Sequence, residues 1–270
     1  MNMITGFIEP TEGEIIVDGY NMAKKPQKAK AEIGYMPEGV PLYTDLTVKE
    51  FVNYMAELKK VNKKERKQKV EKIIEQTGLK DVQNKLTRNL SRGYKQRVSM
   101  AGALVGEPKI LILDEPTVGL DPKQITEIRE LIKELGKTHT VILSSHILSE
   151  VSQICNKVII INKGKLVAID TPEKLENKVS QNNSIYVTVE DTENKMETIK
   201  DKIEDIKEIK LIKENEDGTK QYMIEAEGNT DLRKIIFTEF AKENITIFEM
   251  KKTDTTLEDA FMKLIEGGEK

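Results

Sequence analysis

Residues 110–116 read Ile-Leu-Ile-Leu-Asp-Glu-Pro, and this stretch decides the fold class. Four consecutive apolar residues predict a strand that is covered on both faces, as in parallel sheets. The carboxylates of Asp114 and Glu115 then fall at the C-terminal end of that strand, which is where open α/β sheets bind their ligands. An apolar run ending in Asp-Glu occurs in many strands, so its meaning depends on the surrounding sequence.

The surrounding sequence alternates short β-branched runs with helical patterns as far as residue 181, which predicts an α/β domain with a parallel sheet. Helices are expected behind the cap at Thr47 and from Pro122 to Gly136. The basic segment 59–72 is interpreted as a solvated helix face, because Val70, Ile73 and Ile74 supply a buried side. Strands are expected at 14–18, 32–36, 109–113, 140–143, 157–161 and 165–169.

A second unit is predicted after the polar break at 181–184. Its expected element order is β-α-β-β-α-β, which is that of a ferredoxin-like domain, followed by a closing helix at 257–265. Residues 1–181 carry 29 basic and 24 acidic side chains, whereas residues 182–270 carry 14 and 22. We therefore predict domains at 1–181 and 182–270, the second folding separately and taking no part in chemistry. Its expected core consists of Ile185, Val187, Val189, Ile203, Ile209, Leu211, Ile224, Ile235, Phe240, Ile247 and Phe248.

Composition limits the class of protein. Of the 270 residues 33% are charged and 5% aromatic, no run of 18 apolar residues occurs, and the start lacks the pattern of a signal peptide. One cysteine and two histidines cannot build an internal disulfide or a structural zinc site. Cys155 falls on an apolar helix face and is expected in the core, and His139, next to a strand start, is expected at the surface. No basic stripe alternates with aromatic residues, which argues against nucleic acid as a partner. These features predict a soluble, cytosolic protein.

Three further stretches accompany residues 110–115. Leu90–Arg97 opens a helical pattern with a Ser and a Gly, residues 117–121 follow the two acids, and Ser144-Ser145-His146 closes the next strand. In this order and spacing the four stretches resemble the signature motif, Walker B, D-loop and switch histidine of the ATP-binding cassette of ABC transporters. Any one of them would be weak, but together they are specific. The resemblance implies a P-loop NTPase-type α/β cassette with a helical subdomain at about 40–105.

The resemblance also implies roles for individual residues. Asp114 would hold Mg²⁺, Glu115 would act as general base on the attacking water, and His146 would contact the γ-phosphate of ATP. Ser91 and Gly93 of the signature would contact the nucleotide bound to the opposite subunit. The structural alternatives are a pair of surface acids, a partly buried histidine, and a helix cap with a turn glycine.

Three departures from the family pattern are present. Arg92 stands where the commonest signature has Gly, and Glu38 stands where many members place the Gln of the Q-loop, whereas Asp121 matches the D-loop. Both variants, with the ferredoxin-like tail, resemble the branch of single-cassette exporters that pair with a separate permease. The third departure is larger: no G-x-x-x-x-G-K-[ST] occurs, so Walker A is absent and the resemblance predicts an N-terminally truncated cassette.

The resulting prediction is the ATP-binding and ATP-hydrolysing subunit of an ABC transporter, with ATP and Mg²⁺ as cofactors. Its partners would be a second cassette, as homo- or heterodimer, and a membrane permease that docks on residues 37–58, at the inner face of the cell membrane. Without Walker A, the chain as given is predicted to be inactive alone. Two alternatives remain: a non-catalytic half-cassette that supplies its signature to a complete partner, and a soluble ABC ATPase unlinked to transport. Nucleotide binding by the isolated chain would argue against the first, and the lack of a second cassette or long coiled coil argues against the second.

Overall fold

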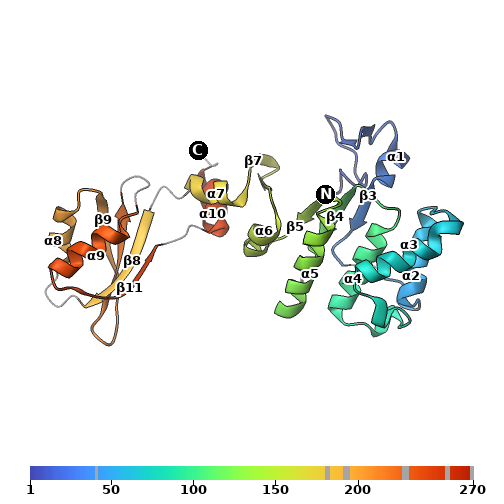
Figure 1. The fold of residues 1–270 in the computed structure, drawn as a ribbon. Helices are drawn as coiled ribbons and strands as arrows, with labels where there is room; N and C mark the ends of the chain where they lie inside the picture. Colours follow the sequence, from blue (N-terminus) through green and yellow to red (C-terminus); the bar gives the residue numbers. More distant parts are fainter. Residues whose placement is uncertain (40–41, 180–182, 191–194, 227–230, 253–255, 268–270) are drawn as a thin grey trace. The chain divides into compact units, whose positions relative to one another are not determined.

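The structure is a computed structural model that describes residues 1–39, 42–179, 183–190, 195–226, 231–252 and 256–267. It separates into two compact units, Met1–Glu150 and Val151–Lys270, each with its own sheets (Figure 1). The candidate site lies in the first unit.

The first unit is built on a parallel sheet with the strand order β3-β4-β5. Its strands are β3 (Ile33–Met36), β4 (Ile110–Asp114) and β5 (Thr140–Ser144). The central strand is the predicted apolar run, and Leu111, Ile112 and Leu113 are at most 1% exposed. The predicted α/β fold class is therefore confirmed around β4.

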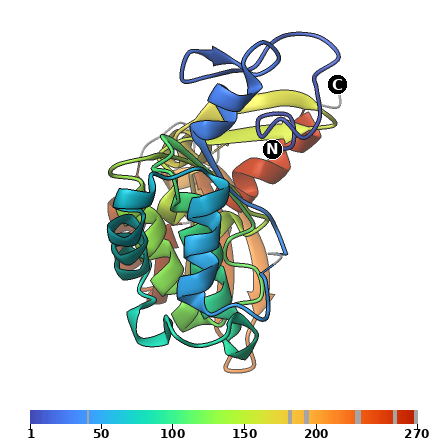
Figure 2. The ribbon, with the colours of Figure 1, turned by 90° about the vertical axis from the view of Figure 1, so that its right-hand side faces the viewer.

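Helices α2, α3 and α4 pack against one another beside this sheet (Figure 2). The Thr47 cap expected before α2 is present, because its hydroxyl accepts from the Glu50 backbone N–H and the Glu50 carboxylate accepts from the Thr47 N–H. The helix expected over the basic segment 59–72 begins later than predicted, at Lys63, and Asn62 caps it as the first residue before α3. The helices are α1 (Pro26–Ala31), α2 (Val48–Leu58), α3 (Lys63–Gln76), α4 (Arg92–Leu104) and α5 (Pro122–Leu135), with 3₁₀ helices at Lys80–Val82 and Thr87–Asn89.

The strand expected at 14–18 is much shorter than predicted. It consists of β1 (Ile16–Val17), which pairs with β2 (Tyr20–Asn21) in a small antiparallel hairpin. Asp18 and Gly19 both have positive φ, so the chain turns directly after Val17. The tight turn explains why the strand ends early.

Helix α4 lies directly against β3 because Gly34 has no side chain. A Cβ at this position would come within 2.3 Å of the Ala103 carbonyl oxygen. Any larger residue at position 34 would push the end of α4 away from the sheet. The contact fixes α4, whose first turn carries the predicted signature residues, relative to β3.

Lys59 ties the end of α2 to the end of α4. Its ammonium nitrogen lies 2.9 Å from the Val105 carbonyl oxygen and 3.4 Å from that of Ala103, both left without helical partners at the C-terminus of α4. A further 3.5 Å contact reaches the Ile33 carbonyl oxygen. Burial lowers the pKa of Lys59 to about 8 from its ordinary value of 10.5.

The low pKa of Lys59 predicts a pH-dependent stability. Between pH 8 and 10.5 the unfolded chain keeps a proton that the folded chain has released, so the free energy of unfolding rises with pH across this window. The rise attributable to Lys59 is at most about 3 kcal/mol. Urea unfolding at several pH values should show this rise in the wild type and in the surface control Lys64→Met, but not in Lys59→Met. Parallel curves for all three proteins would contradict the prediction.

The second unit contains a four-stranded antiparallel sheet with the order β11-β8-β10-β9. Along the chain its elements follow the order β-α-β-β-α-β that the sequence predicts. They are β8 (Asn183–Glu190), α8 (Met196–Lys202), β9 (Ile206–Glu214), β10 (Lys220–Ala226), α9 (Arg233–Lys242) and β11 (Thr246–Lys252). This arrangement is ferredoxin-like.

Most of the predicted core of this sheet is buried, but three members are not. Leu211 is 52%, Ile235 40% and Phe248 62% exposed. Bulges shift the alternation of side chains at Leu211 in β9 and at Phe248 in β11. Ile235 lies beside the α9 stripe that faces the core. The buried positions that the prediction omitted are Met196, Ile199, Ile206, Tyr222, Ala226, Leu232, Ile236 and Ile245.

The last helix, α10 (Leu257–Gly267), does not close the ferredoxin-like sheet as the sequence suggested. It packs instead against α7 (Pro172–Val179) and β7 (Lys165–Asp170), which pairs with β6 (Val158–Asn162). Leu257 and Ala260 on α10 are at most 1% exposed, so this contact buries an apolar stripe. The C-terminal helix therefore contacts residues that precede the boundary predicted at 181.

Candidate functional site

The carboxyl ends of β4 and β5 bring the two predicted acids into one hydrogen-bonded arrangement. The parallel register places Ser144 opposite Asp114. The Ser144 hydroxyl donates to Asp114 Oδ1 at 2.5 Å and accepts from the Glu115 backbone N–H at 3.1 Å. Ser144 thus fixes both acidic residues, a role that the sequence reasoning missed, although the position of Ser144 at the end of the neighbouring strand was a usable signal.

Glu115 and His146 contact each other directly. The His146 Nδ1 lies 2.9 Å from Glu115 Oε2. An ionised carboxylate can only accept, so with Glu115 ionised the bond requires the proton on Nδ1. Glu115 has a φ of +49°, a left-handed conformation that is uncommon outside glycine and occurs often at functional sites. The structure therefore brings together the residues predicted as general base and switch histidine.

A third link joins the same two segments in the interior. The Thr117 hydroxyl donates to Glu150 Oε2 at 2.6 Å, and the two residues are 2% and 6% exposed. Sequence reasoning placed Thr117 in a loop motif and gave Glu150 no role. With the bonds at Ser144 and His146, this contact cross-links residues 114–117 to residues 144–150.

We expect the buried Thr117–Glu150 bond to contribute measurably to stability. Thr117→Val keeps the shape but leaves a buried carboxylate without its donor, which should lower the free energy of unfolding by about 1–3 kcal/mol. Thr126→Val is the matched control, because the Thr126 hydroxyl bonds the Pro122 carbonyl on an exposed helix face, and its effect should be within about 0.5 kcal/mol. Equal losses in the two variants, measured by urea unfolding, would contradict this role.

A cavity of about 550 Å³ opens beside Glu115. Glu38 from the segment after β3 lines it together with Glu115, and Arg92 and Lys95 on α4 line it as well. Two carboxylates and two cationic side chains therefore face one space. The volume of this cavity lies within the range of small-ligand sites.

Comparison with known proteins identifies the family. The model of the ABC transporter family matches residues 1–118. The bacitracin transport ATP-binding protein BcrA of Bacillus licheniformis is 33% identical over 271 residues, which cover 99% of this chain and 84% of BcrA. The chain belongs to the ABC transporter family.

Other relatives agree with this assignment. The linearmycin resistance ATP-binding protein LnrL of Bacillus subtilis is 34% identical over 190 residues, covering 70% of this chain. The chain spans only 61% of the length of LnrL. Among solved structures, CbiO1 of Clostridium perfringens, part of the ABC transporter complex CbiONQ, matches with a TM-score of 0.59 and 31% identity over 66% of this chain and 76% of CbiO1. The first unit therefore has the fold of an ABC ATP-binding subunit, within the P-loop NTPase class.

The remaining predicted cassette residues lie at the beginnings of α4 and α5. Ser91 caps α4, its hydroxyl accepting from the Tyr94 N–H at 3.5 Å, and Asp121 caps α5 by accepting from the Gln124 N–H at 2.9 Å. Gly93 is buried between the two helices, and a Cβ there would come within 2.9 Å of the Gln124 side chain. Among the hydrogen bonds of the described residues, none joins these three residues to Glu115 or His146.

Arg92, which departs from the commonest signature, is accommodated by Gly119 in the predicted D-loop. Gly119 has a φ of +70°, and a Cβ on it would come within 2.2 Å of Arg92 Cζ. The guanidinium therefore occupies space that any other residue at position 119 would fill. Arg92 and Gly119 form a matched pair in this chain.

The acidic pair fits Mg²⁺ with a nucleotide better than it fits a metal alone. In the residues that the structure describes, no group of three or more His, Cys, Asp and Glu side chains converges on one point. Mg²⁺ is commonly held by one or two carboxylates together with substrate phosphates and waters. Asp114, oriented by Ser144 and with the Tyr35 hydroxyl 3.5 Å away, is a suitable carboxylate for this purpose.

His139 and Cys155, for which the sequence predicts no chemical role, have different surroundings from those expected. His139 is half-buried rather than exposed, and its Nδ1 lies 2.8 Å from the Pro108 carbonyl oxygen. Cys155 follows directly after α6 (Leu148–Ile154) and is half-buried, and burial raises the pKa of its thiol. A raised pKa disfavours the reactive thiolate, so Cys155 is no candidate nucleophile.

Helices long enough and apolar enough to cross a bilayer are not found in the described parts of the chain.

Proposed function

We propose that this ATP-binding subunit hydrolyses ATP and powers a separate membrane permease in export. The observation that carries the proposal is the contact between Glu115 and His146 at the carboxyl ends of β4 and β5, beside an Asp114 held by Ser144. The names of similar proteins support a role in transport: one is a bacitracin transport ATP-binding protein, and another is a probable multidrug ABC transporter ATP-binding protein of Escherichia coli.

Each side chain has a distinct task in this proposal. Glu115, oriented by His146 and by its backbone bond to Ser144, orients the attacking water and accepts its proton. His146 contacts the γ-phosphate. Asp114 would hold Mg²⁺, which when bound neutralises charge on the β- and γ-phosphates. The Glu115–His146 bond keeps the two groups in one geometry before substrate arrives.

The same proposal assigns two partners. The beginning of α4, with Ser91 and Gly93, would present free N–H groups and a positive dipole end to a nucleotide on a second cassette. The segment 37–58, which includes Glu38 and α2, would dock on the permease. Glu38 lines the cavity beside Glu115, and α2 belongs to the packed helices α2, α3 and α4, so this segment would link the two. The chain would then work at the inner face of the cell membrane. Residues 182–270 would form an accessory domain outside the chemical step.

The purified 270-residue chain is expected not to hydrolyse ATP by itself. Its sequence holds no glycine-rich phosphate loop or Walker A lysine. Each missing charge-assisted contact to phosphate forfeits about 1.5–3 kcal/mol, and several together weaken binding from micromolar to millimolar. Titration calorimetry with MgATP and a phosphate-release assay test this. Micromolar binding, or turnover above background without a partner, would contradict the expectation.

Glu115 is expected to carry the chemistry once a phosphate loop is supplied. In a chain extended at its N-terminus by the phosphate-loop segment of a relative, Glu115→Gln should lower turnover by about 10²–10⁴. MgATP affinity should change little, because Asp114 remains. Glu130→Gln, at an exposed position on α5, is the isosteric control and should keep full turnover. Near-full turnover by Glu115→Gln would overturn the assignment and with it the proposed mechanism.

A further inference from the structure

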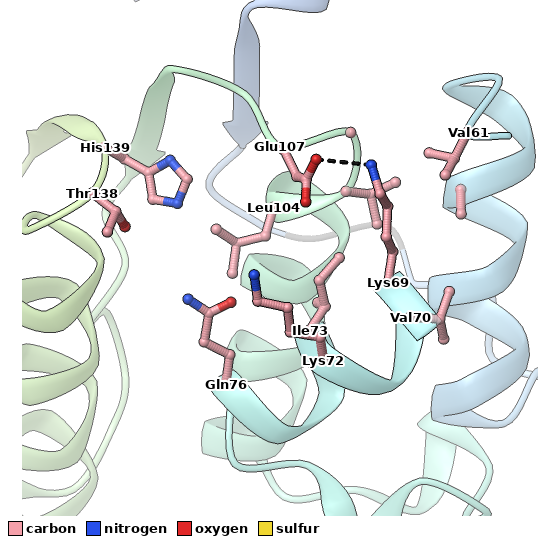
Figure 3. Close-up of a pocket in the computed structure, with 13 residues that line it drawn as sticks. Val61, Lys69, Val70, Lys72, Ile73, Gln76, Leu104, Glu107, Thr138 and His139 are labelled. Atoms are coloured by element: carbon pink, nitrogen blue, oxygen red, sulfur yellow. Dashed lines mark hydrogen bonds and ion pairs between the residues drawn. The ribbon is translucent and has the colours of Figure 1, made fainter. Parts of the chain in front are cut away.

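A second cavity lies at the opposite ends of the strands from Glu115 and His146. It measures about 240 Å³ and lies between α3, the end of α4 and the turn before β5 (Figure 3). His139 immediately precedes the first residue of β5, and Glu107 lies three residues before β4. The cavity is therefore at the amino ends of β4 and β5 and is separate from the site above.

The inner wall of this cavity is apolar. Val70 and Ile73 on α3 and Leu104 and Val105 at the end of α4 line it, and all four are nearly fully buried. Such a surface favours an apolar group that displaces water from it. Alone, an apolar wall would not indicate which ligand binds.

The rim carries two lysines, of which one is already paired. Lys69 is already paired, with Glu107 at 2.8 Å and with Glu65 at 3.3 Å. The turn that places Glu107 there uses two successive left-handed residues, Gly106 at φ +85° and Glu107 at φ +54°. Lys72, one turn of α3 further on, adds a second ammonium group to the rim. Lys69 is thus shared between the carboxylates of Glu107 and Glu65, whereas Lys72 has no carboxylate within ion-pair distance among the described residues, so its ammonium group is the one available to a ligand.

The side chains on the rim are placed to meet a polar head group. Figure 3 shows Lys72 and Gln76 extending from α3 toward Leu104, with the His139 ring at the upper left of the view and the Glu107–Lys69 pair to its right. The His139 ring is held there by its bond to the Pro108 carbonyl. The ammonium of Lys72 and the amide of Gln76 are donors, and a carboxylate accepts from both.

We propose that this cavity binds a small amphipathic carboxylate, with its head on Lys72 and Gln76 and its apolar tail against Ile73 and Leu104. The volume sets the size of the ligand. At about 240 Å³ the cavity admits a small ligand only. Hexanoate has this size and this distribution of polar and apolar groups.

The test is an NMR titration of the full ¹⁵N-labelled chain with hexanoate, following the backbone amides of residues 104–107 and 138–139. Saturable shifts with a dissociation constant of about 0.1–1 mM are expected for so small a ligand. Lys72→Gln should weaken binding about fivefold or more, since it removes the charge at the head group. Lys67→Gln, an exposed lysine on the same helix that does not line the cavity, should leave the constant within about twofold.

Two further ligands distinguish the proposed binding from nonspecific charge attraction and from nonspecific apolar binding. Acetate has the head without the tail, and hexylammonium has the tail with the opposite charge, so both should bind at least about tenfold more weakly than hexanoate. The proposal is overturned if hexanoate gives no saturable shifts up to 10 mM, a concentration about tenfold above the weakest constant expected. It is also overturned if hexylammonium binds as well as hexanoate, or if Lys67→Gln and Lys72→Gln weaken binding equally. Because both lysines are exposed, neither variant is expected to impair folding.

Discussion

The parallel pairing of β4 with β5 is the constraint on which the site depends. Parallel strands end at the same edge of a sheet, so the residues that follow them become neighbours although about thirty positions separate them along the chain. Asp114 meets Ser144, Glu115 meets His146, and Thr117 meets Glu150. If the register slipped by one residue, all three contacts would be lost together. The site is thus a consequence of strand register rather than of three independent contacts.

The position of α4 in the first unit is fixed by its close contact with β3. Gly34 lets the Ala103 carbonyl approach β3, and the ammonium of Lys59 binds the carbonyls that α4 leaves free at its end. The beginning of the same helix packs on α5 through Gly93. Helix α4 therefore links two sites: its first turn holds the residues predicted as the signature, and its last turn lines the second cavity. A ligand in that cavity would contact the same helix.

The two units differ in what stabilises them. In the first, the central strand is buried on both faces and polar side chains meet at its carboxyl end. In the second, four antiparallel strands place a continuous apolar face under α8 and α9, with Ile199, Ile236 and Phe240 fully buried. The candidate site residues Asp114, Glu115 and His146 all lie in the first unit. The second unit contributes a core of its own and, through α10, a contact with α7.

Local sequence was sufficient to predict most elements and the chemical groups at the end of β4. The apolar run before Asp114, the cap at Thr47 and the order of elements after residue 183 are local properties, because each depends on neighbouring residues. Only the tertiary structure decided which of these groups meet. Ser144 and Glu150 carry no local signal for their partners, since those contacts arise from the pairing of distant strands. Bulges exposed Leu211 and Phe248 for the same reason: alternation along a strand is local, whereas register depends on the partner strand.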